Sequence, residues 1–133
     1  MARLVIDPSA LVHLAEGDLT VDPGHQLVAP HSVRSRSLDV LLLRVYAGEL
    51  SEREALELHQ RMTEMKIRLL GDRVSRRTAW NLAVGHGWAS IDGAEYLAVT
   101  QLQADALVAL DTDLVAMATG LVPLVPISKL FSS

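Results

Sequence analysis

The sequence contains no cysteine and few aromatic residues. Without cysteine there is no disulfide framework, no thiolate metal site and no cysteine nucleophile. Aromatic residues make up 4% of the 133 residues, whereas hydrophobic residues make up 50%, so the core must be aliphatic. Charged residues make up 21%, and together with this hydrophobic content they exclude an intrinsically disordered chain.

Long apolar runs are also lacking. No run approaches the roughly 18 residues that span a membrane. Asp7 and Pro8 interrupt the first apolar run, so we expect no signal peptide. We therefore expect a cytoplasmic protein with no membrane contact. The length favours a single domain over residues 1–133.

The net charge of −4 is unevenly distributed along the chain. Residues 34–77 contain ten basic residues against seven acidic ones, whereas the remainder contains two against nine. Such a division suggests that carboxylates gather at one site while basic groups face an anion. Amphipathic helices with solvated, mixed faces would give the same pattern.

Short β-branched runs alternate with helical patterns. Strands are expected over residues 4–6, 26–29, 67–69, 106–110 and 121–125. Helices are expected from residue 8 and over residues 35–47, 51–65, 72–86, 90–102 and 114–119, with a capping box at Ser51 and Glu54. Because hairpin signals are missing, this order predicts an α/β fold, a three-layer α/β/α sandwich with a central parallel sheet.

Acidic residues follow two of the predicted strands. Asp7 ends the first strand, and Asp111 ends the fourth with Asp113 two residues further on. Asp92 and Glu95 begin a helix and project from one face of it. In parallel sheets the carboxyl ends of the strands form the ligand site. Each acid also has a structural explanation, as a helix cap or a first-turn acid.

Converging carboxylates repel one another unless cations lie among them. Oxygen ligands without a His or Cys companion suit Mg²⁺ or Mn²⁺. Such ions activate water and neutralise charge on phosphate, so phosphoryl transfer or phosphodiester hydrolysis is the chemistry expected here. None of the five histidines pairs with a carboxylate at metal-ligand spacing, and no glycine-rich phosphate loop is present.

Five segments, in order along the chain, resemble blocks of the PIN-domain nucleases. They are residues 3–11 (RLVIDPSAL), 28–31 (VAPH), 44–51 (RVYAGELS), 92–98 (DGAEYLA) and 107–111 (LVALD). The short single domain looks most like the VapC-type toxins of bacterial toxin–antitoxin pairs. The resemblance implies a PIN-like fold and a Mg²⁺- or Mn²⁺-dependent endoribonuclease, usually a homodimer, that a VapB-like antitoxin keeps silent.

The resemblance also implies roles for individual residues. Asp7, Asp92 and Asp111 fall on the family's aspartates and would be the catalytic metal ligands, with Asp113 and Glu95 as accessory ligands. In this interpretation a metal-bound water attacks the RNA phosphorus.

Two positions depart from the family pattern. Arg36 stands where the family usually has a glutamate early in the second helix, and Ala109 stands where it often has Thr or Ser. A guanidinium cannot bind a cation, so Asp39 or, preferably, Glu95 would have to compensate. Arg36 is interpreted either as a counter-ion of the carboxylates or, with Arg34, as a ligand of RNA phosphate.

Alternative functions follow from these departures. A catalytically weakened PIN-like protein would bind RNA or an antitoxin without cleavage. A receiver-type signalling domain also gathers aspartates on an α/β sheet, but it needs one at the end of the third strand. Residues 67–71 provide none, which argues against that class.

Some features of the sequence have two interpretations. The basic cluster Arg73, Arg76 and Arg77 either contacts RNA phosphates or forms a solvated helix face. Trp80 and Trp88 are expected to pack in the core or at an interface. The apolar residues over 38–45 and 55–69 exceed what one small sheet face needs, so some are expected to form a groove for an antitoxin helix or a homodimer seam.

Overall fold

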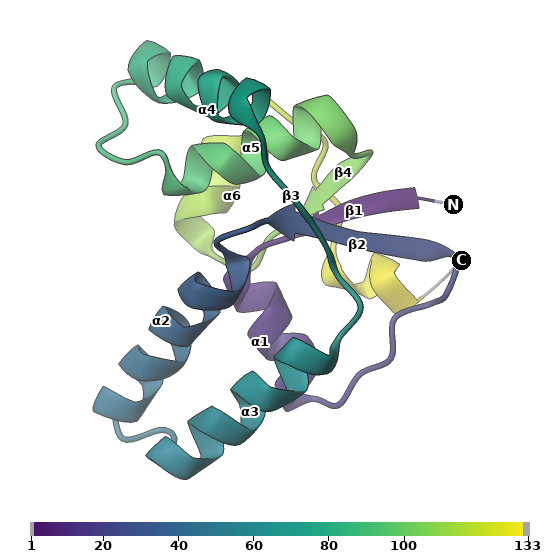
Figure 1. Ribbon diagram of the computed structural model, residues 1–133, viewed down its shortest axis with the longest axis vertical. Coiled ribbons are helices and arrows are strands. Elements are labelled where there is room, and N and C mark those ends of the chain that lie inside the picture. Colours follow the sequence, from purple (N-terminus) through teal and green to yellow (C-terminus); the bar gives the residue numbers. More distant parts are fainter. Residues whose placement is uncertain (1, 132–133) are drawn as a thin grey trace.

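The computed structural model describes residues 2–131 and contains a four-stranded sheet whose paired strands are all parallel (Figure 1). The strands are β1 (Ala2–Ile6), β2 (His25–Pro30), β3 (Arg68–Leu70) and β4 (Ala106–Val108), in the order β3-β2-β1-β4. The helices are α1 (Pro8–Glu16), α2 (Val33–Tyr46), α3 (Glu52–Glu64), α4 (Arg73–His86), α5 (Asp92–Gln103) and α6 (Thr112–Ala118), followed by a 3₁₀ helix, η1 (Ile127–Phe131).

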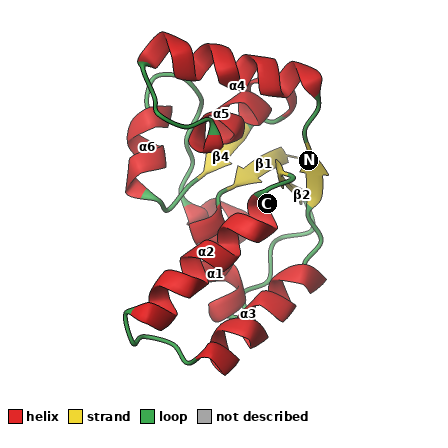
Figure 2. Cartoon of the chain, turned by 60° about the vertical axis from the view of Figure 1, so that its left-hand side comes forward, coloured by secondary structure: helices red, strands yellow, loops and turns green. Residues whose placement is uncertain are grey.

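The helices cover the sheet from two sides. Helices α1, α2 and α3 pack together on one side, and α4 and α5 lie on the other (Figures 1 and 2). This arrangement is the expected three-layer α/β/α sandwich. Both faces of the sheet are therefore buried, which explains why its strands read as continuous apolar runs. Val5, Ile6 and Leu107 are fully buried at the centre of the core.

Local helix signals are largely confirmed. Ser51 and Glu54 form the predicted capping box, and Asp72 with Ser75 forms another at the start of α4. Helix α5 differs slightly, because its N-cap is Ile91 rather than Ser90. The Ser90 hydroxyl still accepts a hydrogen bond from the Asp92 N–H at 3.1 Å.

The predicted fifth strand over residues 121–125 is wrong. This segment makes only an isolated bridge, between Leu124 and Leu107, although two backbone hydrogen bonds connect it to Leu107. Pro123 and Pro126 flank the bridge and have no N–H to donate, so a regular ladder cannot continue. The fourth strand is also shorter than expected and ends at Val108.

Helices α4 and α5 meet through small side chains. Ala79 and Ala83 of α4 pack against Ala94 and Ala98 of α5 in a cluster separate from the main core. Small residues allow two helix backbones to approach closely. The α4–α5 pair therefore forms a unit whose first turns lie near the carboxyl ends of the strands. Within residues 2–131 no helix is long and apolar enough to cross a membrane.

Candidate active site

An acidic cleft lies at the carboxyl ends of β1 and β4. It has a volume of about 260 Å³, and helices α1, α2, α5 and α6 contribute to its wall. The lining includes five carboxylates and one guanidinium, from Asp7, Asp39, Asp92, Asp111, Asp113 and Arg36. The fold thus gathers all four predicted aspartates at the expected edge of the sheet.

Asp7 lies at the base of the cleft, and none of its surface is exposed. Its Oδ1 accepts a hydrogen bond from the Ala10 N–H at 2.8 Å, which caps α1. Its Oδ2 accepts from the N–H groups of Leu110 and Asp111 at 3.1 and 3.0 Å. Burial raises the pKa of Asp7, and the nearby charge of Asp111 adds to the rise, whereas these N–H groups oppose it. Asp7 therefore joins the loop after β4 to the start of α1.

Arg36 enters the cleft and pairs with two of its carboxylates. Its Nη2 donates to Asp92 Oδ1 at 2.9 Å, and its Nη1 donates to Asp39 Oδ2 at 3.2 Å. The charge of Asp92 is the main reason that the pKa of Arg36 is raised. The side chains of Arg36 and Asp92 are each 45% exposed, so an incoming anion can reach the guanidinium. The counter-ion interpretation of Arg36 matches this geometry.

Several carboxylate oxygens in the cleft remain available. Asp111 Oδ1 accepts from the Asp113 N–H at 2.9 Å. Among the described residues, Asp92 Oδ2, Asp111 Oδ2 and both oxygens of Asp113 accept no hydrogen bond. These three side chains can therefore accept a further ligand without breaking an existing hydrogen bond at those oxygens.

Glu95 and Arg34 lie outside the cleft lining, unlike the other predicted site residues. The pKa of Glu95 is raised by burial and by the charge of Asp92, and it is lowered by the charges of Arg76 and Arg36. Glu95 thus lies outside the cleft lining, within electrostatic range of Asp92, Arg76 and Arg36. Arg34 is half-buried. Of the two residues considered as substitutes for the family glutamate, Asp39 is the one that lines the cleft.

Other residues lie in the cleft wall or beside it. Tyr96 is buried in the cleft wall, where burial and the charge of Asp7 raise the pKa of its hydroxyl. Ser9 lines the cleft because it directly follows Asp7 and Pro8, a proximity that the sequence does contain. The approach of Arg76 to Glu95 had no sequence signal, since the two residues lie on different helices.

The donor chemistry of the cleft fits a hard divalent cation, because five of its lining residues are aspartates and its other side-chain oxygens are the hydroxyls of Ser9 and Tyr96. The side chains are not arranged as a finished cage, however. Within residues 2–131 no three His, Asp or Glu side chains are grouped closely enough to hold a metal ion. Arg36 holds one oxygen of Asp92, so cation binding involves a rearrangement of this exposed ion pair.

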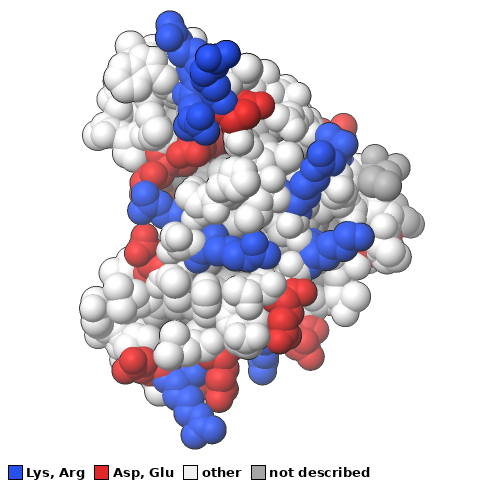
Figure 3. All heavy atoms as spheres, in the orientation of Figure 1, with Lys and Arg blue, Asp and Glu red and all other residues white. Residues whose placement is uncertain are grey.

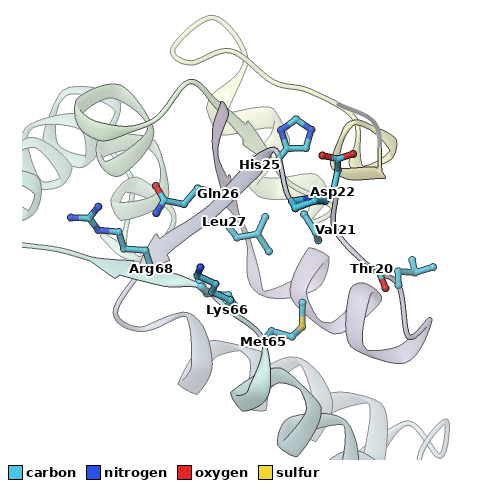
Figure 4. Close-up of a pocket in the computed structure, with 12 residues that line it drawn as sticks. Thr20, Val21, Asp22, His25, Gln26, Leu27, Met65, Lys66 and Arg68 are labelled. Carbon is cyan, nitrogen blue, oxygen red and sulfur yellow. The ribbon is translucent and has the colours of Figure 1, made fainter. Parts of the chain in front are cut away.

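A larger cavity lies at the opposite end of the sheet, where β2 and β3 begin (Figure 4). It has a volume of about 710 Å³, and Leu27, Met65 and Ile67 are among its apolar lining residues. Lys66 and Arg68, which also line it, are exposed. This cavity contains none of the predicted site residues and is separate from the acidic cleft.

Comparisons with known proteins are sparse. No family model and no curated protein sequence matches this chain. Among solved structures, the crystal structure of PAE2754 from Pyrobaculum aerophilum is similar, with a TM-score of 0.71 over 97% of this chain and 92% of that one. The sequence identity is 23%, so the similarity establishes a shared fold and nothing further.

Proposed function

We propose that this protein is a Mg²⁺- or Mn²⁺-dependent endoribonuclease that hydrolyses RNA phosphodiester bonds, as the resemblance to VapC-type toxins implies. One observation carries the proposal: the cleft brings Asp7, Asp92 and Asp111 together from three distant segments of the chain. The gathering of carboxylates costs electrostatic energy, and stability alone does not require it.

The aspartates would have different roles in binding the cation. Asp92 and Asp111 have free oxygens to bind it, with Asp113 as an accessory ligand. Asp7 holds the loop that carries Asp111 through two backbone N–H groups. When bound, the cation supplies an activated water and neutralises charge that develops on the phosphate.

Arg36 would contribute to substrate binding. Its guanidinium is planar and presents several N–H donors, a geometry that suits two oxygens of one phosphate. An RNA phosphate entering the cleft would compete with Asp92 for these donors, which would free a carboxylate oxygen for the cation. Binding of RNA and of cation would therefore favour each other.

The surroundings support further parts of this proposal. Leu42, Leu43 and Tyr46 on α2 and Leu56 on α3 are exposed, as a surface for a VapB-like antitoxin helix or a homodimer seam would be. The cytoplasm is the compartment we propose for an RNA-cleaving toxin.

The test uses purified protein and a broad set of structured RNAs with Mn²⁺, Mg²⁺ or EDTA. We expect cleavage with metal, none with EDTA, and a loss of at least about 100-fold in Asp92→Asn, because one ligand loses its charge. Asp92 suits the test better than Asp7, which is buried and caps a helix. Glu57→Gln on α3, whose side chain is also exposed, is the matched control and should cleave normally.

A second function is favoured by the Arg36–Asp92 ion pair. If the guanidinium permanently replaces the cation, the protein binds RNA or an antitoxin without cleaving RNA. Folded wild-type protein that binds RNA but leaves the whole RNA set intact in Mn²⁺ would support this function and reject the nuclease.

A further inference from the structure

The outer face of α4 carries an exposed tryptophan beside three arginines. Trp80 is 59% exposed, so it belongs to neither of the two hydrophobic clusters. Val74 and Val84 are exposed on the same helix. Of the two expectations for Trp80, packing in the core is therefore wrong, and a contact at an interface remains open.

The arginines and Trp80 share one face of the helix. Arg77 is four residues after Arg73, Trp80 is three residues after Arg77, and these spacings align side chains along one side. Arg76 precedes Trp80 by four residues. Figure 3 shows basic side chains gathered at the α4 end of the molecule, with acidic side chains directly below them. The face defined by Arg73, Arg76, Arg77 and Trp80 is called the α4 face below.

The three arginines of the α4 face form no ion pair with the described residues, although the charge of Arg76 acts on the carboxylates of Asp72 and Glu95. Within residues 2–131, none of Arg73, Arg76 and Arg77 has a carboxylate oxygen within 4.0 Å. Arg73 also lies in the first turn of α4, where a positive charge opposes the helix dipole. An anionic partner would offset the unfavourable position of Arg73 and would find all three guanidinium groups without an ion pair.

The α4 face adjoins the acidic cleft. The charge of Arg76 lowers the pKa of Glu95, which places Arg76 close to the first turn of α5. Asp92, in the same turn, lines the cleft and raises the pKa of Glu95. The close packing of Ala79 and Ala83 against α5 holds α4 in this position.

We infer that the α4 face binds single-stranded RNA next to the cleft, with the arginines on phosphates and Trp80 stacked on an unpaired base. The inference rests on the proposed function, because it assigns a contact to the substrate of the cleft. Aromatic stacking selects unpaired bases, and arginines bind the backbone without reading sequence. A second copy of this chain fits less well, since a twofold interface here would bring the arginines of two copies together.

The test measures binding of a fluorescein-labelled 12-nucleotide oligouridine by anisotropy in EDTA, which prevents metal-dependent cleavage. We expect Trp80→Ala to weaken binding about tenfold and Trp80→Phe, which keeps a ring, to stay within about twofold of wild type. The double variant Arg73→Glu/Arg77→Glu should also reduce the slope of log affinity against log salt by at least about 1.4. Arg53→Glu, at an exposed site on α3, is the matched control that should bind normally.

A parallel sedimentation measurement completes the design. Trp80→Ala protein that binds oligouridine as wild type does, or wild-type protein that does not bind it at micromolar concentrations, would overturn the inference. So would a wild-type dimer that Trp80→Ala converts to a monomer with unchanged RNA affinity, because the α4 face would then be an interface between copies. If wild-type protein cleaves RNA and Trp80→Ala does not change RNA binding, only this inference is rejected. If RNA binding depends on Trp80 but no RNA is cleaved, only the proposed nuclease function is rejected.

Discussion

At the scale of single residues, the hydrogen bonds that each carboxylate already accepts determine whether it can bind a further ligand in the cleft. Asp7 is satisfied by three backbone N–H groups, so its role is tied to the fold. Asp92 is exposed and held by Arg36. The two aspartates fall on the same family pattern but differ in how freely they can change partner. The functional state of the cleft therefore depends mainly on Arg36.

Arg36→Glu should make the stability of the protein depend on divalent cations. The new carboxylate would stand beside Asp39 and Asp92, and like charges would destabilise the metal-free protein. We expect the melting temperature in EDTA to fall by a few degrees, since about 1 kcal/mol corresponds to roughly 3–6 °C at this size. Millimolar Mn²⁺ should restore it, and should shift wild type less.

Calorimetry with and without Mn²⁺ measures this effect, and Arg53→Glu on α3 controls for the added negative charge. An Arg36→Glu melting temperature that is the same in EDTA and in Mn²⁺ would show that the cleft holds no cation even with the family's usual glutamate present.

At the scale of elements, short sequence signals determine where α4 begins and where it ends. Its capping box at Asp72 and Ser75 fixes where the helix begins, and Gly87 ends it in the left-handed region with φ of +69°. The start of α4 thereby places Arg73, Arg76 and Arg77 in its first two turns, near α5.

Two glycines near the end of α4 should respond in opposite ways to alanine. Gly85 lies inside the helix with open space around its Cα, so Gly85→Ala should raise the free energy of unfolding by about 0.5–1 kcal/mol. Gly87 adopts a positive φ, so Gly87→Ala should lower it by about 1–2 kcal/mol. Urea denaturation of both variants checks the pair, and equal shifts of the same sign would contradict this account of the α4 end.

At the scale of the whole molecule, ion pairs between helices connect the layer below the sheet. Arg44 of α2 donates to both carboxylate oxygens of Glu16 on α1, at 3.0 and 2.8 Å. The hydrogen bond from Arg44 holds the pKa of Glu16 below its usual value of 4.5. A lowered pKa in the folded state means that the charged form of Glu16 stabilises the fold.

The stabilisation by Glu16 should therefore depend on pH. It is present above pH 4.5 and is lost as the pH falls through the lowered pKa of the folded state. Because both side chains are partly exposed, we expect Glu16→Gln to cost about 0.5–1 kcal/mol at pH 6 and less at pH 3. Urea unfolding at the two pH values measures this, with Glu57→Gln as the exposed control. A cost that is equal at both pH values would assign the effect to packing instead.

Much of the fold was predictable because its signals act over short distances. The capping box at Ser51, the aspartates that end β1 and follow β4, and the alternation of strands with helices all depend on residues a few positions apart. The prediction of a fifth strand was wrong because it relied on the apolar pattern of residues 121–125. Pro123 and Pro126 prevent a regular ladder there.

The sequence by itself determined that the chain forms a parallel α/β sheet and that aspartates collect at the carboxyl ends of its strands. In a parallel sheet the carboxyl ends of all strands lie at the same edge, so the position of these aspartates can be predicted without knowing how the side chains pack. Only the tertiary structure decided that Arg36 pairs with Asp92, that Asp39 rather than Glu95 lines the cleft, and that Trp80 faces solvent. These contacts depend on how each helix is rotated and placed on the sheet, and that placement follows from the sum of many packing interactions across the molecule.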